Sequence, residues 1–297
     1  MDTHFLQSFV MVVDCGSMAE AARRLDLTPA AVAARVKSLE EGLGTALVRR
    51  AGRTVKATEA GLKVLPHARG VLRDVRDLHA IANDDAPLGE LRLGVSTSSL
   101  TGLLPPILRR LYELHPRLAV FIEPGSSSHL YHQVTTGALD AAVIVQPQFM
   151  LPKPCEWRVL VEEPLCLLAP AAMAGRDPVE LLSSEPFIRY DRAMWGGRLA
   201  DAYLRRLQIK PRERIEIDAL NAIAAFVHQG LGVSLVPDWT PPWPEGLQVI
   251  RMELPPPVPI RRMGIVWSTQ GPRAALSRTL LEVAEAVWTK AASARPP

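Results

Sequence analysis

The sequence predicts a multidomain protein: a small all-α unit at the N-terminus, one long helix after it, and a larger α/β part. Three observations predict this order. Residues 16–50 read as two capped helices joined by a tight turn, and residues 58–83 keep apolar residues at helical spacing. From residue 90 onward, patterns typical of strands and helices alternate along the chain. Such alternation favours a sheet covered by helices in the C-terminal part.

The two N-terminal helices carry their own start and stop signals. Ser17 and Glu20 have the Ser-x-x-Glu spacing of a capping box, which predicts the start of the first helix. Thr28 can cap the second helix, and Pro29 suits its first turn because no N–H bond is lost there. Gly44 ends it. A short helix, a tight turn and a helix with a small-residue outer face form the arrangement that places a helix in the DNA major groove.

A basic segment follows these helices directly. Residues 47–56 read as strand, glycine turn and strand, with four basic residues and no acid: Arg49, Arg50, Arg53 and Lys56. This pattern is typical of the wing of a winged helix-turn-helix, whose cations suit phosphates and a narrow minor groove. The evidence for DNA binding lies in this segment and not in the overall charge, because residues 1–90 contain 12 basic and 12 acidic residues. The net charge of +3 therefore adds nothing to it.

A longer pattern in this unit has a known counterpart. Its members are Phe9, Val13, Gly16, Ser17, Ala21, Ala22, Leu25, Leu27, Thr28, Ala31, Val32, Leu39, Glu40, Leu43, Gly44, Leu47, Arg50, Arg53, Thr58, Ala60 and Gly61. In these residues the chain closely resembles the LysR-type family of bacterial transcriptional regulators. The resemblance implies double-stranded DNA and a small-molecule effector as partners. It also implies a homodimer that pairs into a homotetramer, with RNA polymerase as a further partner.

The chain departs from the family at the positions that the family turns toward base edges. The family usually has Gln at the position of Pro29, Pro or Ser at Ala30, and Ser at Ala33. A good bidentate Gln–adenine pair contributes about 1–3 kcal/mol of discrimination, and neither Pro29 nor Ala33 can form one. We therefore expect readout by Arg35, by apolar contacts to thymine methyls and by DNA shape, on a two-fold operator with an atypical half-site. The alternative is a low-specificity DNA-binding protein of the same fold.

The expected DNA-contacting residues follow from the helix pair, the wing and the resemblance together. They are Ser17, Thr28, Pro29, Ala30, Ala33, Arg35, Lys37, Arg50, Arg53 and Lys56.

The long helix has a wide apolar side. Leu65, Ala68, Leu72 and Val75 alternate by three and four, as in a short coiled-coil seam. An overlapping stripe contains Val71, Val75 and Leu78. The resemblance implies that this helix is the dimer connector; the alternative is a helix packed on its own domain. Pro66 falls early in the helix and should bend it, and residues 83–89 read as a hinge.

The C-terminal part predicts a parallel, doubly wound sheet, with separate strands at residues 158–161 and 165–168. Here the chain resembles the two-lobed, Rossmann-like fold that LysR-type regulators share with periplasmic solute-binding proteins. The expected domains are residues 1–58 for the winged helix-turn-helix, 59–87 for connector and hinge, and 88–297 for the effector domain. Within the last, lobe I covers about 88–162 and 267–297, and lobe II about 163–266. The lobes should join near Glu162 and Trp267.

Three segments leave predicted strands where such folds bind ligands, at the carboxyl ends and against helix N-termini. Hydroxyls and free N–H groups there suit a small anion or carboxylate. Arg189 or Arg192 could add charge, and Tyr190 or Trp195 could cover an aromatic ring. The alternative is that the Ser and Thr hydroxyls only cap helices. The expected effector-binding residues are Ser96, Thr97, Ser98, Ser99, Gly125, Ser126, Ser127, Ile188, Arg189, Tyr190 and Trp195.

The sequence contains few motifs that indicate other classes of function. No glycine-rich phosphate loop and no nucleophile elbow occur, so we expect no enzyme. His129 and His132 lie one helical turn apart without clustered carboxylates or cysteines, and we expect neither a metal nor another cofactor. A solute-binding protein and an enzyme using the cleft between the lobes remain alternatives. The wing and the helix pair argue against both.

The chain also lacks targeting patterns. No apolar run approaches about 18 residues, and the N-terminus does not read as a signal peptide, so we expect no membrane partner and a cytoplasmic location. The odd set of Cys15, Cys155 and Cys166 argues against a disulfide framework. Redox sensing by Cys155 and Cys166 is a weaker hypothesis, because no thiol-activating residues surround them in the sequence.

Overall fold

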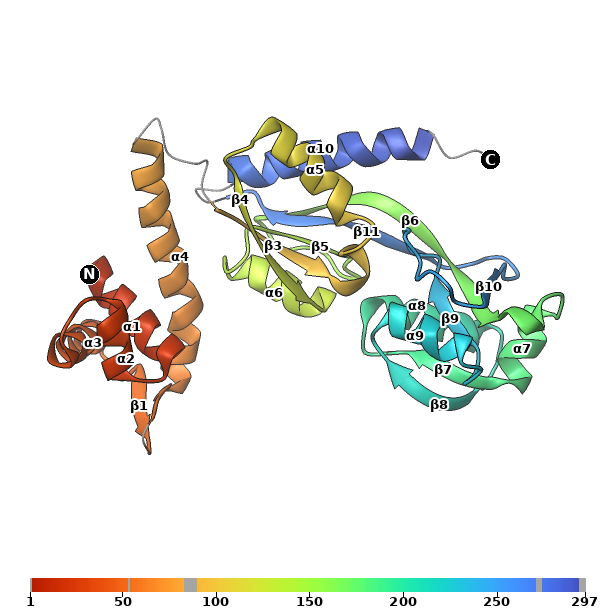
Figure 1. Cartoon of the computed structure of the whole chain (residues 1–297), viewed down its shortest axis with the longest axis horizontal. Helices are drawn as coiled ribbons and strands as arrows, with labels where there is room; N and C mark the ends of the chain where they lie inside the picture. The colour runs from red at the N-terminus through yellow and green to blue at the C-terminus, as the bar shows by residue number, and fades with distance from the viewer. Residues whose placement is uncertain (1, 53, 83–89, 271–273, 294–297) are drawn as a thin grey trace. The chain divides into compact units, whose positions relative to one another are not determined.

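The computed structural model describes residues 2–52, 54–82, 90–270 and 274–293, which belong to two compact units (Figure 1). The first unit contains the helices and hairpin that precede residue 83, and the second begins at residue 90. Two sequence predictions, the role of Arg53 and the hinge at residues 83–89, lie outside the described residues.

The first unit has the predicted order of elements. These are α1 (Thr3–Cys15), α2 (Met18–Arg24), α3 (Pro29–Leu43), β1 (Val48–Ala51), β2 (Thr54–Ala57) and α4 (Glu59–Ala82). The Oγ of Ser17 accepts from the N–H of Glu20 at 3.4 Å, and the Oγ1 of Thr28 accepts from the N–H of Ala31 at 3.2 Å. Both predicted N-caps are therefore confirmed.

Side chains tie the hairpin β1–β2 to the helices around it. One carboxylate oxygen of Glu40, on α3, accepts from the N–H groups of Leu47 and Val48 at 2.7 and 3.0 Å. The Oγ1 of Thr58 donates to the Ala46 carbonyl at 2.7 Å and accepts from the N–H of Gly61 at 3.0 Å. The hairpin is thus held in a defined position beside α3.

Helix α4 uses part of its apolar side within its own unit. Ala68 is only 2% exposed and lies in the core, and Leu65 and Leu72 pack against that core. These three members of the predicted dimer seam therefore serve the fold of the single chain. The overlapping stripe behaves differently, because Val71 and Leu78 are 44% and 65% exposed. The helix continues through Pro66.

Lobe I of the second unit contains β3 (Glu90–Ser96), η1 (Thr97–Ser99), α5 (Leu104–Leu114), β4 (Ala119–Gly125), α6 (Ser127–Thr135), β5 (Ala141–Val145), β11 (Ile260–Ser268) and α10 (Ala274–Ser293). Strand β3 pairs in parallel with β4 and β5, and β11 runs antiparallel to β5. Helices α5 and α10 lie on one face of this sheet and α6 on the other (Figure 1).

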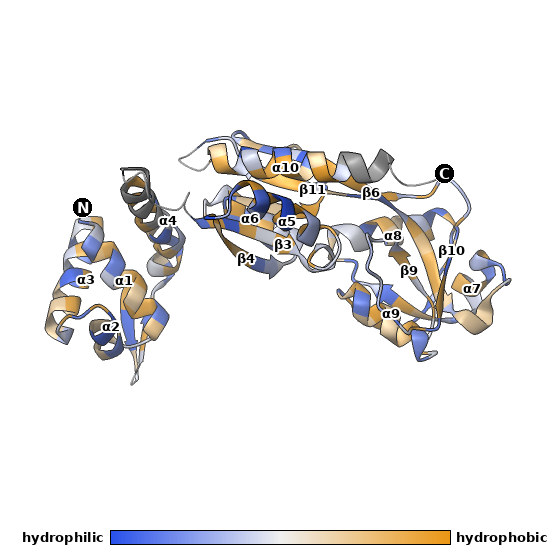
Figure 2. Cartoon of the chain, turned by 45° about the horizontal axis from the view of Figure 1, so that its top comes forward, coloured by the Kyte–Doolittle hydropathy of each residue, from blue (hydrophilic) through white to orange (hydrophobic). Residues whose placement is uncertain are grey.

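Lobe II contains η2 (Ala171–Met173), α7 (Pro178–Ser184), β7 (Pro186–Tyr190), α8 (Trp195–Arg206), β8 (Arg212–Ile217), α9 (Leu220–His228), β9 (Ser234–Pro237) and β10 (Val249–Met252). Strand β6 (Cys155–Pro170) joins the lobes: its first half pairs with β11 and its last residues pair with β9 and β10. Figure 2 shows hydrophobic residues along β9 and β11, which lie in the cores of the two lobes.

Two predictions for this unit need correction, and one helix was not predicted. The two strands predicted at residues 158–161 and 165–168 are one strand, β6, because Pro164 falls where the strand leaves β11 for β9 and no ladder N–H is required. The return to lobe I occurs near Ile260 rather than Trp267, since residues 263–267 already pair with β5. Helix α7 was missed. Within the described ranges, no helix is long and apolar enough to cross a membrane.

A glycine test addresses the fold of the first unit. A Cβ on Gly61 would lie 2.0 Å from the carbonyl oxygen of Leu47, so we expect Gly61→Ala to destabilise this unit by about 2 kcal/mol or more. The matched control is Gly42→Ala in α3, where a Cβ meets no atom within 4 Å and about 1 kcal/mol of stabilisation is expected. Amide hydrogen exchange of peptides from residues 3–82 measures both, and equal protection in the two variants would contradict the close approach.

Candidate functional sites

The N-terminal half of α3 presents the predicted contact residues to solvent. Pro29, Ala30, Ala33 and Lys37 are exposed. Thr28 is exposed as well, although its hydroxyl caps the helix. Ser17 and Arg35 are partly buried: Ser17 caps α2, and Arg35 forms no ion pair with any described residue. At Pro29, Ala30 and Ala33 the exposed side of α3 is therefore small and apolar, with Arg35 and Lys37 next to it.

The hairpin β1–β2 concentrates positive charge. Arg49 lies opposite Lys56 in the antiparallel register, Arg50 lies opposite Val55, and all three cations are exposed. None of the three forms an ion pair within the part of the chain that the structure describes. In contrast, the two arginines of α2 both pair with the carboxylate of Glu20. The hairpin thus offers free cations to an anionic partner such as a phosphate backbone.

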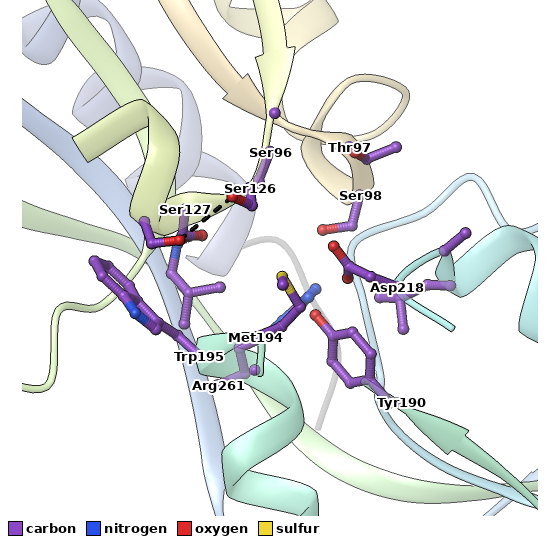
Figure 3. A pocket seen from close by; sticks show the side chains of 16 residues that line it. Ser96, Thr97, Ser98, Ser126, Ser127, Tyr190, Met194, Trp195, Asp218 and Arg261 are labelled. Atoms are coloured by element: carbon purple, nitrogen blue, oxygen red, sulfur yellow. Dashed lines mark hydrogen bonds between the residues drawn. The ribbon is translucent and has the colours of Figure 1, made fainter. Parts of the chain in front are cut away.

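The second unit contains a pocket at the carboxyl ends of five strands, β3, β4, β5, β7 and β8 (Figure 3). The cavity has a volume of about 40 Å³. The lining residues are Ser96, Thr97, Ser98, Gly125, Ser126, Ser127, Ser128, Val145, Tyr190, Met194, Trp195, Gly196, Asp218, Ala219, Leu220 and Arg261. Both lobes contribute, so the pocket lies between them, where folds of this class bind ligands.

Lobe I contributes the hydroxyl groups that the sequence predicted. Ser96, Thr97 and Ser98 line the pocket after β3, and Ser126 and Ser127 line it at the start of α6. The Oγ of Ser127 also accepts from the N–H of Val145 at 3.1 Å, which fixes the end of β5 beside α6. The predicted residue Ser99 lies outside the lining: it is buried, and its Oγ lies 3.0 Å from that of Ser96.

Lobe II contributes Tyr190 and the first turn of α8. A Cβ on Gly196 would lie 2.7 Å from the hydroxyl oxygen of Tyr190, so a larger residue there would displace that ring. Trp195 lies between the pocket and two aromatic rings of lobe I, with centroid distances of 5.6 Å to Phe149 and 6.3 Å to Tyr131. Burial raises the pKa of Tyr190, which therefore stays a neutral hydroxyl group.

Two predicted pocket residues lie elsewhere: Arg189 because side chains alternate along β7, and Ile188 because it lies two residues before the end of the strand. Ile188 is fully buried in the core on the α9 side, away from the lining. Arg189 points to the opposite face from Tyr190 and is 2.9 Å from Asp201 of α8 and 2.5 Å from Glu213 of β8. The alternative cation, Arg192, pairs with Glu213 and Glu216. Neither arginine can add charge to the pocket in this arrangement.

The cation that does reach the pocket is Arg261 of β11, which the sequence reading missed. It is 1% exposed, and its Nε and Nη2 donate to one oxygen of Glu163 at 2.8 and 2.5 Å. The other oxygen of Glu163 accepts from the N–H and the hydroxyl of Thr240, at 2.8 and 3.0 Å. Glu163 lies where β6 passes from one lobe to the other, so this network joins the pocket floor to the crossover.

Asp218 was also missed, although the rule that selected Ser96 and Ser126 would have found it. It follows strand β8 directly and precedes α9, as those serines follow β3 and β4. Desolvation, and then the charge of Asp191, raise the pKa of the Asp218 carboxyl, while the charge of Arg261 lowers it. The residue is exposed to solvent at the rim. The one sequence signal for Arg261 is its place next to Arg262 in a strand, where neighbouring side chains lie on opposite faces. The structure exposes Arg262 and buries Arg261.

Comparison with known proteins shows the family of the chain. The family model of the LysR substrate binding domain matches residues 84–289, and that of the bacterial regulatory helix-turn-helix protein, lysR family, matches residues 3–62. The chain belongs to the LysR family. It is a LysR-type DNA-binding transcriptional regulator with an effector-binding domain.

Among relatives of this regulator, the HTH-type transcriptional activator IlvY of Salmonella typhimurium is 28% identical over 246 residues, 80% of this chain and 83% of IlvY. The HTH-type transcriptional regulator CzcR of Bacillus cereus is 29% identical over 238 residues, 80% of each chain. A full-length OxyR variant from Pseudomonas aeruginosa shares the fold, with a TM-score of 0.71 at 22% identity over 97% of each chain. CbnR, a LysR family transcriptional regulator, has a TM-score of 0.68 at 21% identity, covering 96% of this chain and 99% of CbnR.

The cysteines of the regulator do not resemble a redox site. Cys155 and Cys166 are buried, and burial raises the pKa of Cys166 to about 12 and also raises that of Cys155. Thiols that stay protonated react slowly with oxidants, so the structure gives the redox-sensing hypothesis no support. Among the described residues, no group of three or more His, Cys, Asp or Glu could hold a metal ion, and His129 lies 3.4 Å from Glu123.

Two neighbouring acids provide a matched test of the ion pair. Glu163→Gln removes the charge that compensates buried Arg261, and we expect a loss of about 3–5 kcal/mol in the free energy of unfolding of the effector domain. Glu162→Gln removes an exposed pair with Arg262 and should cost at most about 1 kcal/mol. All six tryptophans lie in the second unit, so urea unfolding followed by tryptophan fluorescence reports on this domain. Equal losses in the two variants would contradict the conclusion that Glu163 compensates a buried charge on Arg261.

Proposed function

We propose that the regulator binds a two-fold symmetric operator with an atypical half-site. In this proposal α3 enters the major groove, where Pro29, Ala30 and Ala33 contact thymine methyl groups and Arg35 provides the hydrogen bonds to base edges. Arg50 and Lys56 of the hairpin contact phosphates. The exposed apolar face of α3 and the unpaired cations of the hairpin support this division of roles.

We further propose that α4 pairs with its copy through Val71, Val75 and Leu78 rather than through the whole predicted seam. Ala68, Leu65 and Leu72 are engaged in the core of the first unit, whereas Val71 and Leu78 are exposed. Such dimers would pair into a tetramer and act on DNA in the cytoplasm, with RNA polymerase as a further partner. Pairing would cover apolar surface that otherwise faces water.

For the effector we propose a small carboxylate bound in the pocket between the lobes. The single observation that carries this proposal is the meeting of five strand ends, serine hydroxyls and the N-terminus of α6 around one space. Binding there contacts both lobes and therefore favours their closed arrangement over a more open one. The shift in population would change the spacing of the DNA-binding units in the oligomer, and with it the bend of the operator.

Selection of binding sites from genomic DNA by the purified protein, at a stated salt concentration, tests the DNA-binding proposal. A discrete two-fold site that differs from the common half-site of the family supports it. Recovery of the common half-site unchanged would contradict the proposed readout. Binding without an enriched motif would favour the low-specificity alternative, which the missing hydrogen-bonding groups at Pro29 and Ala33 make a distinct candidate.

Two arginines should separate base readout from phosphate contact. Arg50→Ala should weaken binding uniformly across sequences and reduce the slope of log K against log salt by about one. Arg35→Ala should relax sequence preference, by about 1–3 kcal/mol at one base pair, more than it lowers non-specific affinity. Affinities for the selected site and for scrambled DNA over a salt series measure both effects. Identical behaviour of the two variants would refute the assignment of separate roles.

Charged substitutions on α4 test the dimer stripe. Val71→Glu and Leu78→Glu should favour monomers, because each places a charge where an apolar contact is proposed. The control is Leu62→Glu on the opposite side of the same helix, where a 61% exposed leucine lies outside the stripe and no change of mass is expected. Light scattering of the three variants gives the outcome, and a dimer that survives both stripe substitutions would exclude this interface.

A further inference from the structure

The pocket between the lobes has two ends of different character. At the lobe I end lie the hydroxyls of Ser126 and Ser127 and the N-terminus of α6, which carry no formal charge but attract anions. At the other end lies the carboxylate of Asp218, which points into the pocket from the side opposite Ser126 and Ser127 (Figure 3). A ligand that spans the pocket therefore meets a positive electrostatic environment at one end and a negative charge at the other.

The negative end is built by the pairing of two strands. Tyr190 at the end of β7 pairs in parallel register with Ile217 at the end of β8. The next residues, Asp191 and Asp218, therefore leave the sheet side by side. Asp191 is engaged locally, since its Oδ1 accepts from the N–H of Ala193 at 2.7 Å. Its charge nevertheless acts on Asp218, which lines the pocket.

The charge of Arg261 acts on the Asp218 carboxyl and opposes the pKa rise that desolvation and Asp191 cause. Within the described residues Asp218 forms no ion pair, and α9 begins after Ala219 without a side-chain cap. The nearby cation, Arg261, is already compensated by Glu163, which accepts from both Nε and Nη2. The exposed carboxylate of Asp218, next to a second acid and without an ion pair, can accept a cation that arrives with the ligand.

We propose that the effector is a small zwitterion, an aminocarboxylate with an apolar side group. Its carboxylate binds at Ser126 and Ser127, and its protonated amine binds Asp218. The apolar part contacts the walls between the two ends, formed by Val145, Met194, Trp195 and Leu220. This inference rests on the proposal that the pocket is the effector site. It adds that an amine on the ligand, and not the carboxylate alone, determines specificity.

The test uses matched ligands that differ by one charged group. The full-length protein is titrated calorimetrically with leucine, with isocaproate, which lacks the amine, and with isopentylamine, which lacks the carboxylate. The other standard amino acids and γ-aminobutyrate, each with its deaminated acid, extend the series. The variants are Asp218→Asn, Ser126→Ala and the control Asp238→Asn, whose carboxylate pairs with Arg251 and does not line this pocket.

We expect at least one aminocarboxylate to bind about tenfold or more tightly than its deaminated acid. Asp218→Asn should remove that preference by weakening the zwitterion and strengthening the plain acid, while Asp238→Asn leaves both unchanged. Ser126→Ala should weaken both ligands. If plain acids bind as tightly as aminocarboxylates and Asp218→Asn changes neither, the zwitterion is excluded while the pocket remains the effector site. If binding is insensitive to both Asp218→Asn and Ser126→Ala, or no compound binds, the proposed effector site fails as well.

Discussion

The buried ion pair between Glu163 and Arg261 is the constraint on which the effector domain most depends. Glu163 lies at the point where β6 passes from lobe I to lobe II, and Arg261 lies on the strand that returns. Both side chains are nearly inaccessible to solvent. Because an unpaired charge is costly in such a place, the two crossovers must stay together, with Thr240 satisfying the remaining oxygen. The same pair affects the electrostatics of the pocket, since Glu163 accepts two hydrogen bonds from Arg261, and Asp218 forms no ion pair among the described residues.

The first unit also depends on a few contacts between distant residues, here hydrogen bonds and a close backbone approach. Glu40 of α3 binds two consecutive N–H groups at the start of the hairpin, and Gly61 allows α4 to approach the carbonyl of Leu47. These contacts fix the recognition helix, the basic hairpin and the long helix in one arrangement. A DNA-binding surface that combines a major-groove helix with phosphate contacts requires such rigidity, because its elements must meet the duplex together.

Much of the candidate site could be predicted because it follows a rule of topology. Serines after the ends of β3 and β4 line the pocket as expected, since ligands of α/β folds collect at the carboxyl ends of strands. The same rule applied to β8 would have selected Asp218. Arg189 does not line the pocket, because side chains in a strand alternate between faces and its neighbour Tyr190 takes the pocket side.

The sequence by itself determined the local structure of this protein: the N-caps at Ser17 and Thr28, the end of α3 at Gly44, the hairpin and the succession of strands and helices. These features depend on residues close together along the chain, where capping and periodicity act. Only the tertiary structure decided which face of α4 is free, that β6 is one continuous strand, and that Arg261 rather than Arg189 reaches the pocket. Each of these depends on residues far apart in the chain, such as Glu163 and Arg261, and no local pattern encodes which distant partner satisfies a buried charge.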